Sequence, residues 1–285
     1  MFVKGISYWS FPGGLEGSAP VAKVFADAKK AGFESVEVCL SETGDVSLQT
    51  TEQSAKDIIK AANDDAGIKI SSVATGLFWG KSLSANDPKV RAEALEYAKK
   101  LIDVAAWLDA GAVLLIPGAV DVFFDPSAEV VDYSAVWDRA TEAVGALVPQ
   151  AEAAKIAIGI ENVWNKFLVG PMELKVFIDQ FNSDWVGSYF DVGNCMNVGY
   201  PEQWIKVLGK RIKRVHLKDF RRAAGTADGF VDLLSGDVNW PAVIKALHEV
   251  GYDSFLTAEM IPLYANYPEV LVDNTSRAMD AILGR

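Results

Sequence analysis

Four side chains of types that commonly bind metals end four successive apolar runs in the second half of the chain. They are Glu161, Asp191, His216 and Glu259, and their runs read IAIGIE, WVGSYFD, IKRVH and FLTAE. Three carboxylates and one imidazole gathered in one place would repel one another without a counter-charge. A divalent cation removes that conflict, and oxygen-rich ligation with one nitrogen suits Mn²⁺ best, with Mg²⁺ or Co²⁺ as alternatives. The pattern predicts a site for one divalent metal ion.

A cation at such a site would polarise the carbonyl of a keto sugar and acidify the neighbouring C–H bond. One glutamate, Glu161 or Glu259, could remove that proton, and the other could return one. Return on the opposite face gives an epimer, return at the next carbon gives an aldose, and loss of a β-hydroxyl makes the protein a dehydratase. These residues therefore favour deprotonation next to a carbonyl through a metal-stabilised enediolate, and they leave the outcome open.

Each of the four residues also has a purely structural explanation. Glu161 and Glu259 could form ion pairs at a sheet edge, Asp191 could accept hydrogen bonds in a turn, and His216 could be a core histidine. Four such residues at four successive run ends favour the metal site over this alternative. The other histidine, His248, falls within an amphipathic helical pattern and is expected to be structural.

Other polar and aromatic residues follow the apolar runs and could contact a substrate. The stretch from Lys218 to Arg222 is the most basic in the chain and could bind a sugar hydroxyl or a phosphate, or form a solvated loop. Aromatic side chains could wall a pocket or belong to the core. The predicted substrate contacts are Trp9, Glu42, Trp79, Asn194, Lys218 and Arg222, and Phe11, Phe78, Lys81, Trp164 and Arg221 are weaker candidates.

Strand-like and helix-like segments alternate along the whole chain. Strands are predicted near Val3–Tyr8, Ser35–Leu40, Lys69–Ala74, Ala112–Ile116, Ile156–Glu161, Val186–Asp191, Ile212–Lys218 and Phe255–Glu259. Helices are predicted near Pro20–Ala31, Thr51–Ala66, Pro88–Leu108, Tyr133–Ala154, Pro171–Phe181, Pro201–Leu208, Trp240–Val250 and Pro268–Leu283. Most strands are continuously apolar, as expected for parallel strands buried on both faces.

Short glycine-containing phrases mark the predicted junctions between helices and strands. Gly32, Gly67, Gly111 and Gly251 each follow a helical pattern, where a left-handed glycine would end the helix. Eight such units without a break in composition indicate one (β/α)₈ TIM barrel domain over residues 1–285. A doubly wound open sheet is the alternative, but no G-x-G-x-x-G or P-loop motif follows a strand. In a barrel the strand ends meet on one face, which would bring the four ligand candidates together.

The bulk composition limits the possible partners. The chain has 285 residues, half of them hydrophobic, and a net charge of −11, which disfavours nucleic acids and anionic membranes. Two cysteines, Cys39 and Cys195, are expected to be reduced thiols, as in a cytoplasmic protein. The start of the sequence does not resemble a signal peptide, and no run reaches the length of about 18 apolar residues that a membrane span needs.

At these residues the chain resembles the xylose isomerase-like sugar phosphate isomerase/epimerase superfamily. The resemblance covers nearly the whole length, and its motifs are IGIEN, YFDVGN, VHLKD and LTAEM. A His-x-Lys-Asp sequence followed about forty residues later by a strand ending in Glu is fairly specific for it. The resemblance implies a TIM barrel, one divalent metal held by Glu161, Asp191, His216 and Glu259, the two glutamates as acid and base, and a homo-oligomer, either a dimer or a tetramer.

Two branches of the superfamily are close to this chain. Epimerases of free ketoses usually have a second Glu six residues after the first ligand and a His three residues after the Asp, where this chain has Phe167 and Asn194. The Arg six residues after the metal-binding His is present as Arg222. The DVGN and Glu259-Met260 sequences look more like the phosphopentulose branch. The substrate is therefore expected to be a ketose or a ketose phosphate, with epimerisation at C3 as the favoured reaction.

Three other functions are alternatives to this one. The related endonuclease IV-like enzymes use several histidines to hold three zinc ions, and this chain has only two histidines. An inosose dehydratase-like lyase would use the same four ligands. A non-catalytic sugar-binding barrel would bind a ketose without proton exchange, although the intact glutamate pair disfavours it.

Overall fold

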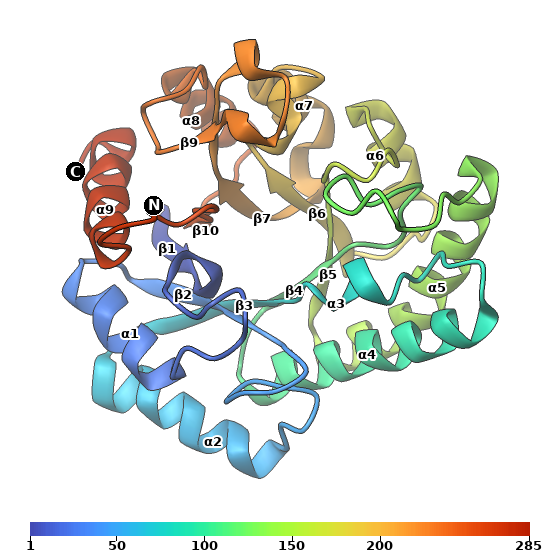
Figure 1. The fold of residues 1–285 in the computed structure, drawn as a ribbon, viewed down its shortest axis with the longest axis horizontal. Helices are drawn as coiled ribbons and strands as arrows, with labels where there is room; N and C mark the ends of the chain where they lie inside the picture. Colours follow the sequence, from blue (N-terminus) through green and yellow to red (C-terminus); the bar gives the residue numbers. More distant parts are fainter.

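The computed structural model describes all 285 residues and contains a closed barrel of eight parallel strands (Figure 1). The order around the barrel is β1-β10-β7-β6-β5-β4-β3-β2, and pairing of β1 with both β10 and β2 closes it. This closure excludes the doubly wound open sheet. The barrel strands are β1 Val3–Ser7, β2 Ser35–Cys39, β3 Lys69–Ala74, β4 Ala112–Leu115, β5 Ala157–Glu161, β6 Val186–Asp191, β7 Ile212–Leu217 and β10 Phe255–Ala258.

A ring of helices surrounds the strands, as Figure 1 shows. The helices are α1 Val21–Lys30, α2 Glu52–Lys60, α3 Leu77–Gly80, α4 Pro88–Trp107, α5 Tyr133–Ala154, α6 Pro171–Asp179, α7 Pro201–Leu208, α8 Trp240–Glu249 and α9 Glu269–Leu283. All eight predicted helices are present with ends within a few residues of those expected. The predicted Thr51–Ala66 helix is α2 followed by a π-helical turn, Ala61–Ala66.

The glycine prediction is confirmed at three junctions and wrong at the fourth. Gly32, Gly67 and Gly251 have positive φ angles, whereas Gly111 does not, and Asp109 takes the left-handed conformation instead. The structure gives another reason for a glycine at this position. A Cβ atom on Gly111 would lie 2.6 Å from Nη2 of Arg214. Gly111 therefore makes room for a guanidinium group rather than ending a helix.

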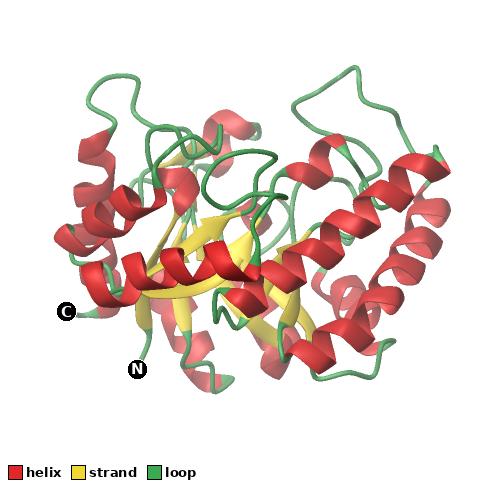
Figure 2. Ribbon diagram, turned by 90° about the horizontal axis from the view of Figure 1, so that it is seen from below, coloured by secondary structure: helices red, strands yellow, loops and turns green.

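Two short additions lie where the sequence predicted only loops. Helix α3 is a single turn after β3, and strands β8 Asp219–Phe220 and β9 Phe230–Val231 form a small antiparallel pair after β7. Figure 2 shows both termini at one end of the barrel and long loops at the other. These long loops follow the carboxyl ends of the strands, where barrel enzymes carry their active sites. None of the helices combines the length and the apolar character that a membrane crossing requires.

Candidate metal centre and adjoining cavity

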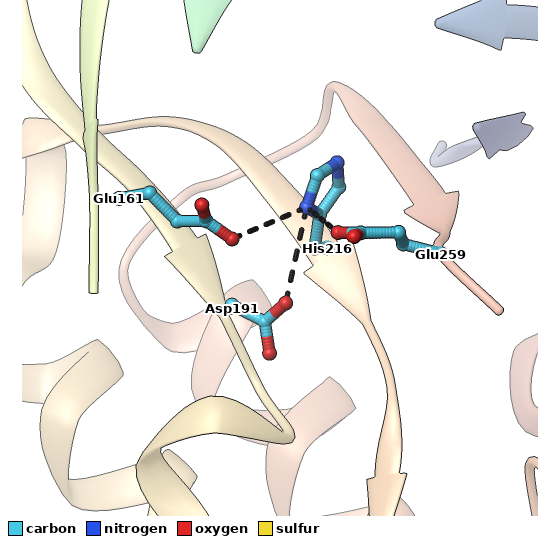
Figure 3. Close-up of side chains that lie close together, drawn as sticks. All are labelled: Glu161, Asp191, His216 and Glu259. Carbon is cyan, nitrogen blue, oxygen red and sulfur yellow. Dashed lines mark ion pairs between the residues drawn. The ribbon is translucent and has the colours of Figure 1, made fainter. Parts of the chain in front are cut away.

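The four predicted ligands converge at the carboxyl ends of adjacent strands (Figure 3). Glu161 and Asp191 are the last residues of β5 and β6, His216 is the second-last residue of β7, and Glu259 follows β10 directly. Nδ1 of His216 lies 3.7 Å from Glu161 Oε1, 3.8 Å from Asp191 Oδ2 and 2.6 Å from Glu259 Oε2. Parallel pairing of β5, β6, β7 and β10 sets this arrangement, because it aligns their ends on one face.

Glu161, Asp191, His216 and Glu259 are here called the quartet. Their donor atoms fit one divalent cation. One ligand atom from each residue lies within 4.8 Å of the others, a span that ligands about 2.1–2.4 Å from a shared ion can cover. Asp191 Oδ2, His216 Nδ1 and Glu259 Oε2 are buried and have no hydrogen-bond partner of acceptable geometry. These three atoms face one point, where their close contacts are with one another and with the ammonium group of Lys218, although buried polar atoms usually have well-formed hydrogen bonds. A bound metal ion would satisfy all three.

Lys218 is the one cation within this cluster. Its Nζ lies 3.1 Å from Asp191 Oδ2 and 3.0 Å from Glu259 Oε2, and only 12% of its side chain is exposed. Gly193 provides space for it, because a Cβ on Gly193 would lie 2.5 Å from Cβ of Lys218. Predicted as a substrate contact, Lys218 thus also balances part of the negative charge of the quartet.

Burial and mutual contacts shift the pKa values of the quartet in different directions. Burial raises the pKa of Glu161 to about 7. Burial would also raise the pKa of Glu259, but Lys218 and His216 outweigh it and lower this pKa to about 2. For His216, burial favours the neutral ring, but Glu37 and Glu259 outweigh it and raise the pKa. A metal ion would compete with these protons, because a metal-binding imidazole is neutral.

A second layer of hydrogen bonds holds the imidazole, and the sequence analysis missed it. Nε2 of His216 lies 2.9 Å from Oε1 of Glu37, a fully buried residue in the middle of β2. The other carboxylate oxygen of Glu37 accepts hydrogen bonds from Tyr189 Oη and from Ser72 Oγ, the latter at 3.1 Å. A carboxylate that binds the far nitrogen of a ligating histidine fixes its tautomer and ring orientation. A charged residue within the apolar run SVEVC was the available signal.

Two asparagines hold Asp191, and one of them also contacts Glu161. Asn162 exchanges two hydrogen bonds of 2.8 Å with the backbone of Asp191. Asn194 donates its backbone N–H to Asp191 Oδ1 at 2.7 Å, and its side-chain amide lies 3.4 Å from Glu161 Oε1. Asn194 thus holds the carboxylates of Asp191 and Glu161, whereas Asn162 holds the backbone of Asp191. Asn194 therefore has a positioning function whether or not it also contacts a substrate.

A cavity of about 610 Å³ opens next to the quartet at the carboxyl ends of the strands. Glu161 and Glu259 line it, whereas Asp191 and His216 do not and are fully buried. Five of the six predicted substrate contacts line the cavity, together with Trp164: these are Trp9, Glu42, Trp79, Asn194 and Lys218. Phe11 and Phe78 are buried away from it, in the core.

Arg222 is the predicted substrate contact that does not line this cavity. Its Nη2 donates a hydrogen bond of 2.9 Å to the carbonyl of Gly199, and its guanidinium lies 4.2 Å from the ring centre of Tyr200. Its backbone N–H donates to Asp237 Oδ2. Arg222 lies between the paired strands β8 and β9, which the sequence did not predict. Arg222 would have to leave these contacts to reach a substrate.

Comparisons with known proteins agree with this architecture. A protein of Escherichia coli K12 named "Putative L-ribulose-5-phosphate 3-epimerase SgbU" is 27% identical over 260 residues, which cover 89% of this chain and 88% of that protein. The structure of D-psicose 3-epimerase from Clostridium cellulolyticum H10 with D-tagatose superimposes with a TM-score of 0.81 at 18% identity, covering 99% of both chains. The structure of 3-keto-D-glucoside 4-epimerase from E. coli has a TM-score of 0.78 at 12% identity, with both chains covered completely.

The family assignment follows from a match over most of the chain. Residues 25–274 match the family model described as xylose isomerase-like TIM barrel, and this range includes all four residues of the quartet. The chain belongs to the xylose isomerase-like TIM barrel family.

Proposed function

We propose that this protein is a metal-dependent sugar epimerase or isomerase that removes a proton next to the carbonyl of a keto sugar, with epimerisation at C3 as its main reaction. One observation carries this proposal. Of the four residues of the quartet, only the two glutamates, Glu161 and Glu259, line the cavity. Asp191 and His216 are buried behind them and could bind a metal without reaching a substrate. The quartet thus presents two carboxylates to the cavity, as an inversion of one carbon by a separate base and acid requires.

The two glutamates can divide the proton transfers between them. In Figure 3 they approach the imidazole from opposite sides. One carboxylate takes the proton from C3, and the other returns a proton to the opposite face, which inverts that carbon. A divalent cation held by the quartet would supply electrostatic stabilisation of the negative charge that develops on the carbonyl oxygen. Lys218, close to Glu259 and Asp191, keeps the local charge from becoming strongly negative.

The names of similar proteins support an isomerase. The curated relative from E. coli is named as a 3-epimerase of a pentulose phosphate, and the compared solved structures are named as a 3-epimerase and a 4-epimerase of keto sugars. All three names describe inversion of a carbon bearing a hydroxyl group. Mn²⁺ is the metal we expect, because oxygen donors with one nitrogen suit it. We expect a homo-oligomer, as the resemblance implied.

The test is proton NMR in D₂O of the metal-loaded protein with ribulose, xylulose, tagatose, psicose, fructose, their phosphates and inosose. Deuterium at C3 together with a new epimer is the expected result. Deuterium at C1 or C2 with an aldose product would make the protein an isomerase, and loss of water from inosose would make it a dehydratase. The absence of exchange with every sugar, while Glu161→Gln and Glu259→Gln variants bind sugar normally, would leave a sugar-binding barrel.

A further inference from the structure

A cluster of aromatic rings, here called the aromatic rim, forms one wall of the cavity. It consists of Trp79, Phe123, Phe124 and Trp164. We propose that the substrate is an uncharged sugar larger than a monosaccharide, whose second ring packs on this rim at the place where a phosphate would otherwise be recognised. The reaction at the quartet is taken from the proposed function, whereas the substrate class is argued from the walls of the cavity.

The cavity wall lacks a cation that could bind a phosphate. Lys218 is the only lysine or arginine that lines it, and its ammonium group already contacts Asp191 and Glu259. Lys218 and a divalent ion would together balance the three carboxylates of the quartet. Two further carboxylates in the wall, Glu16 and Glu42, would then remain uncompensated. A phosphate dianion in this cavity would be repelled rather than attracted.

The neighbouring basic side chains are held by other partners. Arg221 donates from Nε to the carbonyl of Ser235 at 3.0 Å, and Arg222 is held by Gly199 and Tyr200 as described above. Lys81 pairs with Glu93 at 2.7 Å.

No long α-helix begins at the cavity wall. Many barrels bind phosphate at the start of a helix, where free N–H groups and the helix dipole favour an anion. The only α-helix that contributes residues to the cavity wall is α3, which has four residues. One turn carries little of the dipole of a full helix. The cavity wall therefore offers a phosphate neither a free lysine or arginine nor the start of a full-length α-helix.

The size of the cavity exceeds that of a single sugar. Because a CHOH unit fills about the same volume as a water molecule, roughly 30 Å³, a ketohexose fills about 180 Å³. The cavity volume of about 610 Å³ accommodates a second ring in addition to the reacting one. A monosaccharide would leave most of the apolar wall in contact with water.

The aromatic rim has the chemistry to hold that second ring. Its rings contact one another edge to face, with centroids 5.2 Å apart for Trp79 and Phe124 and 5.7 Å apart for Phe123 and Trp164. Phe123 and Phe124 are nevertheless 43% and 57% exposed. Exposed aromatic clusters next to a polar site commonly mark a binding surface. The C–H face of a pyranose packs on such rings and needs no charge.

Four probes that share one ketose test this proposal: fructose, fructose 6-phosphate, isomaltulose and maltulose. The last two carry a neutral glucosyl group at O6 and O4. Binding is measured with the Mn²⁺-loaded protein by quenching of the tryptophan fluorescence, and turnover by deuterium exchange at C3. We expect at least one glucosyl ketose to bind about tenfold tighter than fructose, the effect of an added aromatic contact. We expect fructose 6-phosphate to bind about tenfold more weakly than fructose at low salt, and less weakly at high salt.

Variants assign these effects to the named side chains. In Phe124→Ala the preference for the glucosyl ketose over fructose should fall severalfold. Val130→Ala removes an exposed apolar side chain from the same loop, outside the cavity wall, and should leave the preference unchanged. In a Glu16→Gln, Glu42→Gln double variant the penalty for fructose 6-phosphate should shrink.

The outcomes separate this inference from the proposed function. Tighter binding or faster exchange with fructose 6-phosphate than with fructose, or weaker binding of both glucosyl ketoses than of fructose, would overturn the inference, even if exchange at C3 occurs. The expected order of binding without any exchange would support the substrate class and contradict the proposed reaction.

Discussion

A substitution of Glu37 tests whether a residue behind the four proposed ligands affects the affinity for the metal ion. The carboxylate of Glu37 is fully buried and lies within hydrogen-bond distance of three groups: His216 Nε2 at 2.9 Å, Ser72 Oγ at 3.1 Å and the hydroxyl of Tyr189. A Glu37→Gln variant keeps the size of the side chain and an oxygen that can face the imidazole. It removes the negative charge that would make His216 a stronger metal ligand and would fix the orientation of its ring.

The expected effect is on metal binding. Loss of such a partner typically lowers metal affinity by about 10–100-fold, which corresponds to about 1.4–2.7 kcal/mol. Isothermal titration of the metal-free protein with Mn²⁺ measures it, and circular dichroism checks that the barrel is intact. Glu42→Gln is the matched control, because it removes the same charge from the exposed loop after the same strand, and its affinity should stay within about threefold. An unchanged Mn²⁺ affinity in Glu37→Gln would refute the argument that Glu37 supports the ligand.

Four further predictions follow from the same structure. Asp191→Asn should lower Mn²⁺ affinity by more than about 100-fold in the same titration, since Asp191 is a proposed ligand itself. Addition of Mn²⁺ at about 100 times its Kd should raise the free energy of unfolding by about 2.7 kcal/mol, and a chelator should reverse this, as followed by urea denaturation. Burial raises the pKa of the Cys39 thiol to about 12 and also raises the pKa of Cys195. Both free thiols should therefore resist a thiol reagent near pH 8 until the protein is unfolded. Rapid labelling of the native protein would contradict this expectation. Asp280→Asn should lower the unfolding free energy by about 1–3 kcal/mol, because the buried ammonium of Lys4 would lose its charged partner at 2.5 Å. A change below about 0.5 kcal/mol would show that this ion pair contributes little.

The quartet could be predicted from the sequence because the barrel itself brings strand ends together. Glu161, Asp191 and His216 are far apart along the chain, but each ends an apolar run, and parallel pairing places them side by side. Continuous apolar runs also located the eight strands, and proline and glycine signals located the helices between them. Local patterns were sufficient to locate a strand or helix wherever its periodic segment ended at a clear proline or glycine signal.

Features that depend on contacts between distant segments could not be predicted in this way. Glu37 lies inside a strand, and its partner His216 is 179 residues away, so no local pattern links them. The orientation of Arg222 depends on the segment that contains β8 and β9 and on Tyr200. Gly111 looked like a helix end, but its lack of a side chain serves the guanidinium of Arg214. Tertiary contacts decide each of these positions.

The aromatic rim shows the same limit for loops. Phe123 and Phe124 lie in a segment between β4 and α5 that has no regular secondary structure. In such a segment the sequence pattern does not predict which way a side chain points. Only the structure shows that both rings contact Trp79 of the short helix α3. The residues that we propose to select the substrate thus include two in a segment where sequence patterns are least informative.

The most direct test of the central claim follows deuterium exchange at C3 of a responding ketose while metal is added stepwise to the metal-free protein in D₂O. The account predicts no exchange without metal, a linear rise with added Mn²⁺, and a break at one equivalent per chain. Glu161→Gln and Glu259→Gln should bind the metal more weakly and show no exchange even when saturated. Exchange that persists in a chelator, or that survives in both variants, would contradict a reaction run by these two glutamates at a single metal centre.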